Sequence, residues 1–244
     1  MAVVFFFISF FYSMVGLGGG SSYVAVLALM DLPYEQIPFI SLICNLIVVG
    51  SGSFHYLRSG YFRSKLFFPV MLSSIPMAFI GASISISKHL FLVILGITLV
   101  LMGIRLFFGG YWKKDQGEIK ECLPVLGVII GSILGMLSGL LGIGGGIFLS
   151  PILLLLKWGS PKEVAATTSI FVLFNSLSGL LGHLNRHVEH FLLNDYWPLF
   201  LVVIVGGQLG SFLGSKKISQ RAVGSLTAFL VFFVGCRTLL KVWG

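Results

Sequence analysis

The sequence contains very few charged residues. Only 10% of its 244 residues are Asp, Glu, Lys or Arg, whereas about 25% is usual in a soluble domain. The deficit extends over the whole length, and 57% of the residues are hydrophobic. Apolar runs of about 20 residues recur, and a helix of this length can cross the hydrocarbon core of a bilayer. The composition therefore predicts a helical integral membrane protein with no separate soluble domain.

Carboxylates are absent from the apolar segments. All eight acidic residues lie outside them: Asp31, Glu35, Asp115, Glu118, Glu121, Glu163, Glu189 and Asp195. Proton and cation relays usually need a carboxylate inside the membrane, so this absence disfavours a cation pathway. The nucleophile-elbow, zinc-protease and P-loop patterns are absent as well, which removes the simplest enzyme interpretations. We expect no cofactor.

Paired cysteines are also lacking. Cys44, Cys122 and Cys236 are scattered and form no C-x-x-C pair, so we expect neither a disulfide framework nor a metal site. The net charge of +8 could indicate nucleic-acid binding. However, the Lys and Arg residues occupy short loops and helix ends, where membrane topology explains them better. The expected partners are therefore the lipid bilayer and a small solute, and not nucleic acid.

Six apolar segments predict ordinary membrane-spanning helices: Phe39 to Leu57, Leu66 to Ser87, Leu90 to Phe108, Val164 to Leu184, Tyr196 to Ser215 and Ala222 to Leu240. Two further segments, Met1 to Met30 and Pro124 to Leu156, are interrupted by glycine clusters. The second would be ~50 Å long as one helix, too long for one upright span. Both segments are expected to form helix–turn–helix hairpins whose arms each reach part way through the membrane.

The two halves of the sequence repeat one another. Residues match in one order at offsets of 128 to 132: Pro33 with Pro161, Glu35 with Glu163, Ser41 with Ser169, His55 with His183, Arg58 with Arg186, Pro69 with Pro198, Gly81 with Gly210 and Gly103 with Gly235. This agreement predicts an internal duplication. We expect a first repeat over 1–110, a charged loop over 111–122 and a second repeat over 123–244, within one membrane domain.

The basic residues indicate the relative orientation of the repeats. If both glycine-broken segments crossed fully, the sixteen Lys and Arg would divide ten to six between the two sides. If both are re-entrant, twelve lie on one side, and only Lys88, Arg186, Arg237 and Lys241 lie on the other. Because Lys and Arg collect on the cytoplasmic side, the re-entrant arrangement is favoured, with eight full spans as the alternative. The predicted fold is an all-α membrane protein of two inverted repeats, each with a re-entrant hairpin and three transmembrane helices.

The glycine clusters are the first candidates for a binding site. Non-helical backbone at membrane depth is tolerated only where it is buried in protein or lines a cavity, and helix N-termini bind anions. The substrate-binding candidates at the two breaks are Gly18, Gly19, Gly20, Ser21, Ser22, Gly144, Gly145 and Gly146. The alternative is close helix packing through the G-x-x-x-G spacings of Gly16 with Gly20 and Gly142 with Gly146.

Polar residues inside the predicted spans form a second candidate group. They are Ser41, Asn45, Thr168, Ser169, Asn175 and Gln208. Ser41 and Asn45 are four residues apart, so their side chains face the same way on a helix. Polar groups are costly against lipid and should face the interior of the bundle, where they could bind substrate or bond neighbouring helices.

Two His-x-x-Arg pairs lie where a predicted span meets its loop. They are His55 with Arg58 and His183 with Arg186. These pairs could draw anions toward the site or act as gates. The alternative is that they anchor the helix ends, with the long side chains reaching from the apolar region to water.

These features together resemble the TauE/SafE family of sulfite and organosulfonate exporters. The resemblance rests on the doubled Gly-x-Gly-Gly-Gly cluster, on Thr168-Ser169 before a polar helix centre and on the His-x-x-Arg ends, and it covers essentially the whole chain. It implies a multi-pass permease of the bacterial inner membrane that exports sulfite, a sulfonate or a related anion, and it allows an oligomer.

The first half departs from this pattern, with Ile40-Ser41 where the second has Thr168-Ser169. The residues alone predict an anion without identifying it. A secondary transporter working by alternating access is the first interpretation. An anion channel of the same architecture and a membrane enzyme or assembly factor without a transport role are the alternatives.

Overall fold

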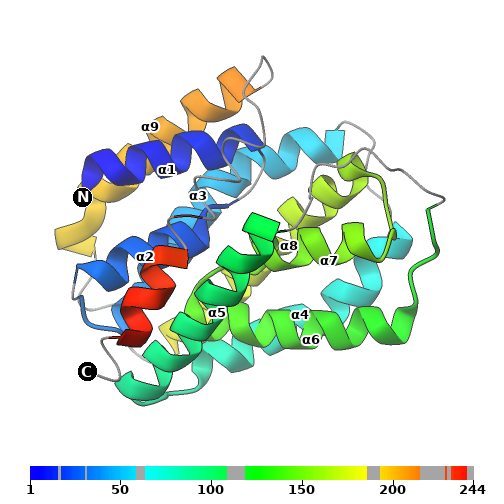
Figure 1. Cartoon of the computed structure of the whole chain (residues 1–244). Coiled ribbons are helices and arrows are strands. Elements are labelled where there is room, and N and C mark those ends of the chain that lie inside the picture. The colour runs from blue at the N-terminus through cyan, green and yellow to red at the C-terminus, as the bar shows by residue number, and fades with distance from the viewer. Residues whose placement is uncertain are drawn as a thin grey trace.

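The computed structural model describes residues 1–15, 18–30, 32–58, 64–108, 119–185, 193–214, 229 and 232–240. The helices of this part are α1 (Ala2–Val15), α2 (Gly20–Leu29), α3 (Gln36–Arg58), α4 (Ser64–Ser83), α5 (Lys88–Phe108), α6 (Pro124–Leu141), α7 (Gly146–Leu155), α8 (Pro161–Leu184) and α9 (Leu193–Gly214). Residues 232–240 are also helical. The prediction of an all-α protein is confirmed for the described residues (Figure 1).

The predicted spans coincide with observed helices. Within the described residues, four helices are long and apolar enough to cross a membrane: Ser64–Ser83, Lys88–Arg105, Pro124–Leu141 and Glu163–Leu184. The helices α3 and α9 have 23 and 22 residues, with shorter apolar stretches over Gln36–Gly50 and Tyr196–Gly210. The predicted span from Ala222 to Leu240 lies partly outside the described residues, and its described end is the helix over 232–240.

Both glycine-broken segments form pairs of helices, as predicted. The helices α1 and α2 have 14 and 10 residues, and α6 and α7 have 18 and 10. At about 1.5 Å per residue, α2 and α7 reach through about half of the hydrocarbon core. Helix α6 is long and apolar enough to cross the membrane, so the expectation that each arm stops part way stays a prediction. The apolar run of α6 continues from Pro124 until the left-handed Gly142 (φ 71°) ends the helix.

The second hairpin, α6 and α7, turns back on itself. The backbone N–H of Lys120, just before α6, donates a 2.7 Å hydrogen bond to the carbonyl of Lys157, just after α7. Trp158 packs in the same buried cluster as Leu66, which lies in the first turn of α4. The start of α4, the start of α6 and the end of α7 therefore lie together at one end of the bundle.

The first hairpin, α1 and α2, opens toward the other end of the bundle. The chain passes from α2 into α3 through Tyr34, whose ring contacts Phe91 in the first turn of α5, with ring centroids 5.8 Å apart. The start of α5 follows the end of α4 and is therefore far from the start of α4. In Figure 1 the N-terminus, marked N, lies on the same side as the end of α2.

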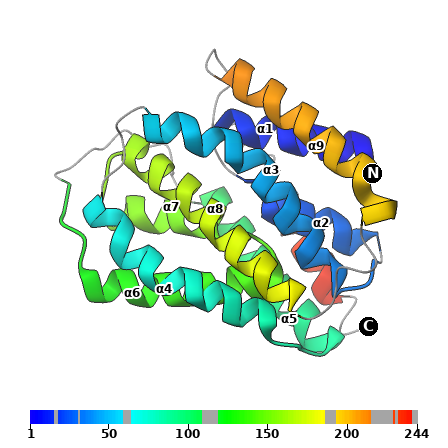
Figure 2. The ribbon, with the colours of Figure 1, turned by 180° about the vertical axis from the view of Figure 1, so that it is seen from behind.

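Six of the helices form three groups. Figures 1 and 2 show α1 with α9 at one side of the bundle, α4 with α6 at the opposite side, and α3 and α8 between them. Glycines allow the outer pairs to approach closely. Gly81 of α4 lies against the carbonyl of Met136 on α6, and Gly210 of α9 lies against the carbonyl of Phe10 on α1.

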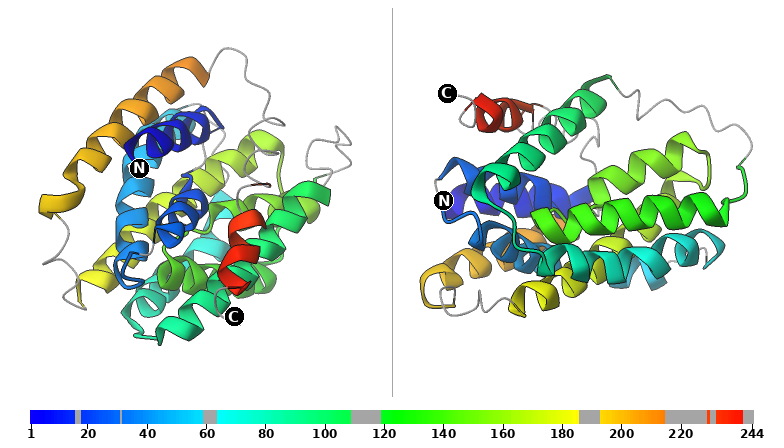
Figure 3. Two further views of the ribbon diagram at one scale, coloured as in Figure 1. Left: turned by 60° about the vertical axis from the view of Figure 1, so that its left-hand side comes forward. Right: turned by 90° about the horizontal axis from the view of Figure 1, so that it is seen from below.

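Helix α5 packs against the C-terminal helix over 232–240 (Figure 3). Gly103 of α5 lies against Phe232, while Gly235 lies against Val100 of α5. Because residue numbers rise along one helix as they fall along the other, the two helices are antiparallel.

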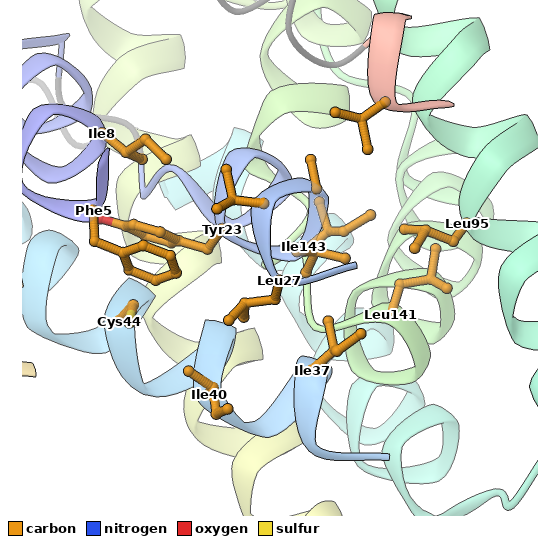
Figure 4. Close-up of a cluster of buried hydrophobic side chains, with 14 of the residues drawn as sticks. Phe5, Ile8, Tyr23, Leu27, Ile37, Ile40, Cys44, Leu95, Leu141 and Ile143 are labelled. Atoms are coloured by element: carbon orange, nitrogen blue, oxygen red, sulfur yellow. The ribbon is translucent and has the colours of Figure 1, made fainter. Parts of the chain in front are cut away.

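The core surrounds the short helix α2. Its residues from Gly20 to Leu27 are all buried, as expected of a helix that is apolar on every side. Phe5 of α1 stacks on Tyr23 of α2, with ring centroids 5.0 Å apart. Figure 4 shows this cluster, which continues through α3 and into the second half at Leu141 and Ile143.

Candidate functional site

Each short helix begins after a glycine with a left-handed backbone. Gly19 precedes α2 with φ 78°, and Gly145 precedes α7 with φ 73°. A Cβ atom makes this conformation costly for other residues, whereas glycine adopts it freely. The glycine clusters therefore redirect the chain and expose the N-terminus of a helix inside the bundle, as the sequence predicts.

The two helix starts have the same hydrogen-bond pattern. The carbonyl of Gly19 accepts bonds from the N–H groups of Ser22 and Tyr23, at 3.0 and 3.1 Å. The carbonyl of Gly145 accepts bonds from Phe148 and Leu149, both at 3.1 Å. The first N–H groups of a helix have no carbonyl within the helix to bond. Each turn thus presents free backbone donors and the positive end of a helix dipole.

The two turns meet inside the bundle. Gly20 lies so close to the carbonyl of Ile143 that a Cβ atom would not fit. The Ser41 hydroxyl lies 3.1 Å from the carbonyl oxygen of Gly20 and 2.7 Å from that of Gly142, so it bridges the two hairpins. Ser41 is therefore a buried contact between the turns.

Residues of both hairpins, together with Val172 of α8, line one hollow at this meeting point. They are Tyr12, Gly18, Gly19, Gly20, Ser21, Ile143, Gly146, Ile147 and Val172. The hollow has a volume of about 10 Å³, which corresponds to about one water molecule. None of these residues is charged, so the two helix starts are the source of positive potential beside the hollow. An anion bound there would have to widen it.

Asn45 of α3 lies between the two turns with an unsatisfied amide. Its side chain is 0% exposed, and neither Nδ2 nor Oδ1 has a hydrogen-bond partner. A Cβ atom added at Gly18 would lie 2.6 Å from Oδ1, and one added at Gly144 would lie 2.7 Å from Nδ2. The amide therefore touches both turns. An unpaired buried polar group costs roughly 1–3 kcal/mol, and this one is placed to bond a polar ligand held between the turns.

Hydroxyl groups gather at the start of α2. The Ser21 Oγ is buried and has no hydrogen-bond partner. The Ser22 Oγ lies 2.7 Å from the hydroxyl oxygen of Tyr12 on α1. The sequence does not predict Tyr12 as a site residue. Its position seven residues before Gly19, inside an aromatic run of α1, resembles that of a packing residue.

The second half contributes fewer polar groups to the turns. Thr168 directs its methyl group toward Gly146, and its hydroxyl lies 3.2 Å from that of Ser150 on α7. Ser169 is buried next to it on α8. Val172, one turn further, touches Gly18, Gly144 and Gly146 with its methyl groups. Sequence reasoning missed Val172, because a single valine in an apolar helix has no distinguishing pattern.

Two of the sequence candidates lie elsewhere. The Asn175 amide donates to the Ser74 hydroxyl at 3.2 Å and to the Phe171 carbonyl at 3.0 Å, so it joins α8 to α4. Gln208 lies on an exposed face of α9. The structure does not bring these two side chains to the turns, and a role for them in binding stays a prediction.

The His-x-x-Arg pairs are described in part. His183 is 1% exposed, and its Nε2 lies 3.0 Å from the Gly139 carbonyl, so it links α8 to α6. His55 and Arg58 are in the last turns of α3, but their side chains, like the whole of Arg186, lie outside the described residues. A gating or anion-attracting role for these pairs stays a prediction.

Comparison with known proteins relates the whole chain to one group. The family model described as Sulfite exporter TauE/SafE matches residues 1–238. A probable membrane transporter protein of Sinorhizobium fredii is 28% identical over 242 residues, which are 98% of this chain and 97% of that protein. A probable membrane transporter protein of Bacillus subtilis is 26% identical, over 94% of this chain and 92% of its own length.

A plant protein shares a shorter region. The Sulfite exporter TauE/SafE family protein 1 of Arabidopsis thaliana is 34% identical over 115 residues, which are 47% of this chain and 24% of the plant protein. No solved structure matches the chain.

Proposed function

Because the chain belongs to the Sulfite exporter TauE/SafE family, and is thus a multi-pass membrane transporter and not an enzyme, we propose that it carries a small sulfur-containing anion. The substrate is sulfite or an organosulfonate, bound between the two glycine turns. The protein moves it by alternating access, as an exporter in a bacterial inner membrane.

The meeting of the two helix starts with Asn45 is the observation that carries this proposal. Two left-handed glycines, Gly19 and Gly145, hold two helix N-termini beside one hollow. Asn45 supplies a buried amide that has no partner and touches both turns. Backbone N–H groups and helix dipoles suit an anion, and a site without a fixed basic side chain can release the anion as well as bind it.

An inverted duplication accounts for the way the two halves pack. Gly103 lies against Phe232, and Gly235 lies against Val100. Gly235 lies 132 residues after Gly103, and Phe232 lies 132 residues after Val100. The same contact therefore occurs twice, with the roles of the two halves exchanged. The two helices involved are antiparallel, which supports a two-fold axis in the plane of the membrane and opposite orientations for the two repeats.

The site is closed to both sides in this structure, which is one of the states that an alternating-access transporter passes through. The glycines of both turns and the Asn45 side chain are buried, and the hollow between them has room for about one water molecule. Since the first hairpin opens toward one end of the bundle and the second toward the other, a small displacement of either hairpin would expose the site to one side only. A channel would instead need a path open to both sides.

Flux measurements on the purified protein in vesicles test this proposal. We expect sulfite uptake that saturates with concentration and that is accelerated by sulfite on the opposite side of the membrane. Flux that rises without saturation and shows no such acceleration would indicate the channel. Absence of flux for sulfite and for sulfonates, with sulfate and a carboxylate tested in parallel, would refute the proposed substrate class.

A further inference from the structure

The walls of the hollow differ sharply in polarity. The first hairpin contributes the hydroxyl groups of Tyr12 and Ser21, whereas the opposite wall consists of the side chains of Ile143, Ile147 and Val172. The hollow is thus lined by hydroxyl groups on one side and by aliphatic groups on the other.

This difference recurs at matched positions of the two turns. Counted from the left-handed glycine, Ser21 of α2 corresponds to Ile147 of α7, and the next residue, a serine in α2, is a phenylalanine in α7. Asn45 and Val172 both touch Gly18 and Gly144. At the two matched turn positions the first half has a serine and the second half an apolar side chain, and of the two side chains that touch the same glycines, Asn45 of α3 is polar and Val172 of α8 is apolar. Two backbone turns of the same geometry are therefore combined with unlike side chains.

Two polar groups of the first half, the Ser21 hydroxyl and the Asn45 amide, have no hydrogen-bond partner, whereas the Tyr12 hydroxyl is paired with that of Ser22. Ser21 lines the hollow, and its Oγ is buried and has no hydrogen-bond partner. The Asn45 amide, which touches the neighbouring Gly20, is also unpaired. These groups can bond the oxygen atoms of an anion whose charge lies between the two helix starts. The opposite wall offers no side-chain donor, so an oxygen atom directed at the side chains of Ile147 and Val172, and not at the backbone N–H groups that start α7, would lose its hydration without compensation.

We propose, resting on the proposed function, that the site selects an organic anion with one oxyanion end and a small apolar substituent. The oxyanion lies toward Ser21 and Asn45 and accepts bonds from both helix starts, while the substituent lies against Val172 and Ile147. Val172 is then a residue that determines specificity. An inorganic anion with oxygen atoms on all sides, or an organic one with a hydroxyl group on its substituent, fits the aliphatic wall less well.

Two sulfonates of equal charge and equal number of heavy atoms test this proposal. In 1-propanesulfonate a methyl group occupies the place of the hydroxyl group of 2-hydroxyethanesulfonate. With the full-length protein in detergent, we expect calorimetric Kd values that favour 1-propanesulfonate by about tenfold, the lower end of the discrimination that an apolar pocket achieves against a hydroxyl group or a missing methylene. In Val172→Thr, which keeps the shape and adds a hydroxyl group, the preference should shrink to about twofold or less.

Val164→Thr is the matched control, because Val164 is equally buried on the same helix but does not line the hollow. It should retain the tenfold preference. If both sulfonates bind and the preference is absent in the wild type, or is unchanged in Val172→Thr, the selectivity proposal is overturned while the anion site stands. If neither sulfonate nor sulfite binds, the proposed function itself fails. Should Val172→Thr not fold, the wild-type comparison still decides the matter.

Discussion

The backbone of Lys120 is hydrogen-bonded to that of Lys157 over 2.7 Å, which joins the entry of α6 to the exit of α7. The 36 residues between them include α6, the glycine turn and α7. Because Lys120 and Lys157, which flank this segment, are hydrogen-bonded to each other, the two ends lie on the same face of the membrane. The bond therefore favours a re-entrant second hairpin over a full crossing.

Cysteine labelling tests this topology. On a background in which the three native cysteines are replaced, single cysteines at Lys120 and Lys157 should react with an impermeant maleimide from the same side of the membrane. Both positions are exposed. Lys88, at the start of α5, is exposed as well and should react from the opposite side. Reaction of Lys120 and Lys157 from opposite sides would establish eight full crossings instead.

Lys157 is expected to reduce stability through its backbone. Its backbone is left-handed, with φ 57°. The N–H of Lys157 donates to the Leu154 carbonyl, and the N–H of Trp158 donates to the Leu153 carbonyl. This pattern is typical of a helix C-terminus that has glycine at the left-handed position. Lys157→Gly removes the steric cost of the Cβ atom, but it also makes the unfolded chain more flexible. The free energy of unfolding should therefore rise by only about 0.5–1 kcal/mol. Melting temperature in detergent measures the effect.

Lys120→Gly is the control for that substitution. Lys120 also lies at the Lys120–Lys157 bond but is not among the residues with positive φ, so glycine there should leave the melting temperature unchanged or lower it. A lower melting temperature for Lys157→Gly would show that the lysine side chain stabilises the end of α7 more than its backbone destabilises it.

The glycine turns should affect binding as well as folding. Gly19→Ala places a Cβ atom 3.2–3.3 Å from Tyr12, Ile8 and Tyr23, a tight but tolerable fit, so the main cost is the left-handed φ. We expect a loss of about 1–2 kcal/mol in stability and a weakening of sulfite affinity by about tenfold, as one charge-assisted bond is lost. The melting temperature and the Kd for sulfite are measured on the same sample.

Gly50→Ala is the matched control on α3, because nothing lies within 4 Å of an added Cβ atom there. It should keep normal affinity and gain about 0.5–1 kcal/mol from the stiffer helix. If Gly19→Ala is destabilised yet binds sulfite as the wild type does, the glycines serve packing alone.

The two buried asparagines should respond in opposite ways. Asn45 has no hydrogen-bond partner, whereas Asn175 bonds Ser74 and Phe171. Asn45→Ala should weaken sulfite binding by about tenfold or more with little loss of stability, because the alanine removes an unpaired amide. Asn175→Ala should lower stability by about 1–3 kcal/mol and leave the affinity unchanged. A wild-type sulfite affinity in Asn45→Ala would exclude Asn45 from the site.

The helices and their breaks were predictable from the sequence. Apolar runs of spanning length and the two glycine clusters each leave a local signal, and the observed α2 and α7 begin within those clusters at Gly20 and Gly146. Ser41 and Asn45 were predictable as a pair, since a four-residue spacing places them on one helix face. Both lie at the turns.

Side-chain partners between distant segments were not predictable in this way. Tyr12 and Val172 lie in apolar runs, and only the meeting of the two hairpins makes them line the hollow. His183 looks like a residue at a membrane boundary, but Gly179 of α8 lies against the backbone of Gly139, and the His183 ring bonds the Gly139 carbonyl of α6. Gln208 was expected inside the bundle because of its polarity, and the rotation of α9 exposes it.

The two turns are in close contact, so the measured affinity depends on two equilibria. One is the separation of the hairpins, and the other is the binding of the anion to the open form. If the anion enters only when the hairpins have separated, the apparent Kd equals the intrinsic Kd divided by the fraction of molecules that are open. The Ser41 hydroxyl, which bridges the Gly20 and Gly142 carbonyls, favours the closed form by about 0.5–1.5 kcal/mol. Residues that never touch the anion can therefore set its half-saturating concentration, simply by determining how rarely the empty carrier opens.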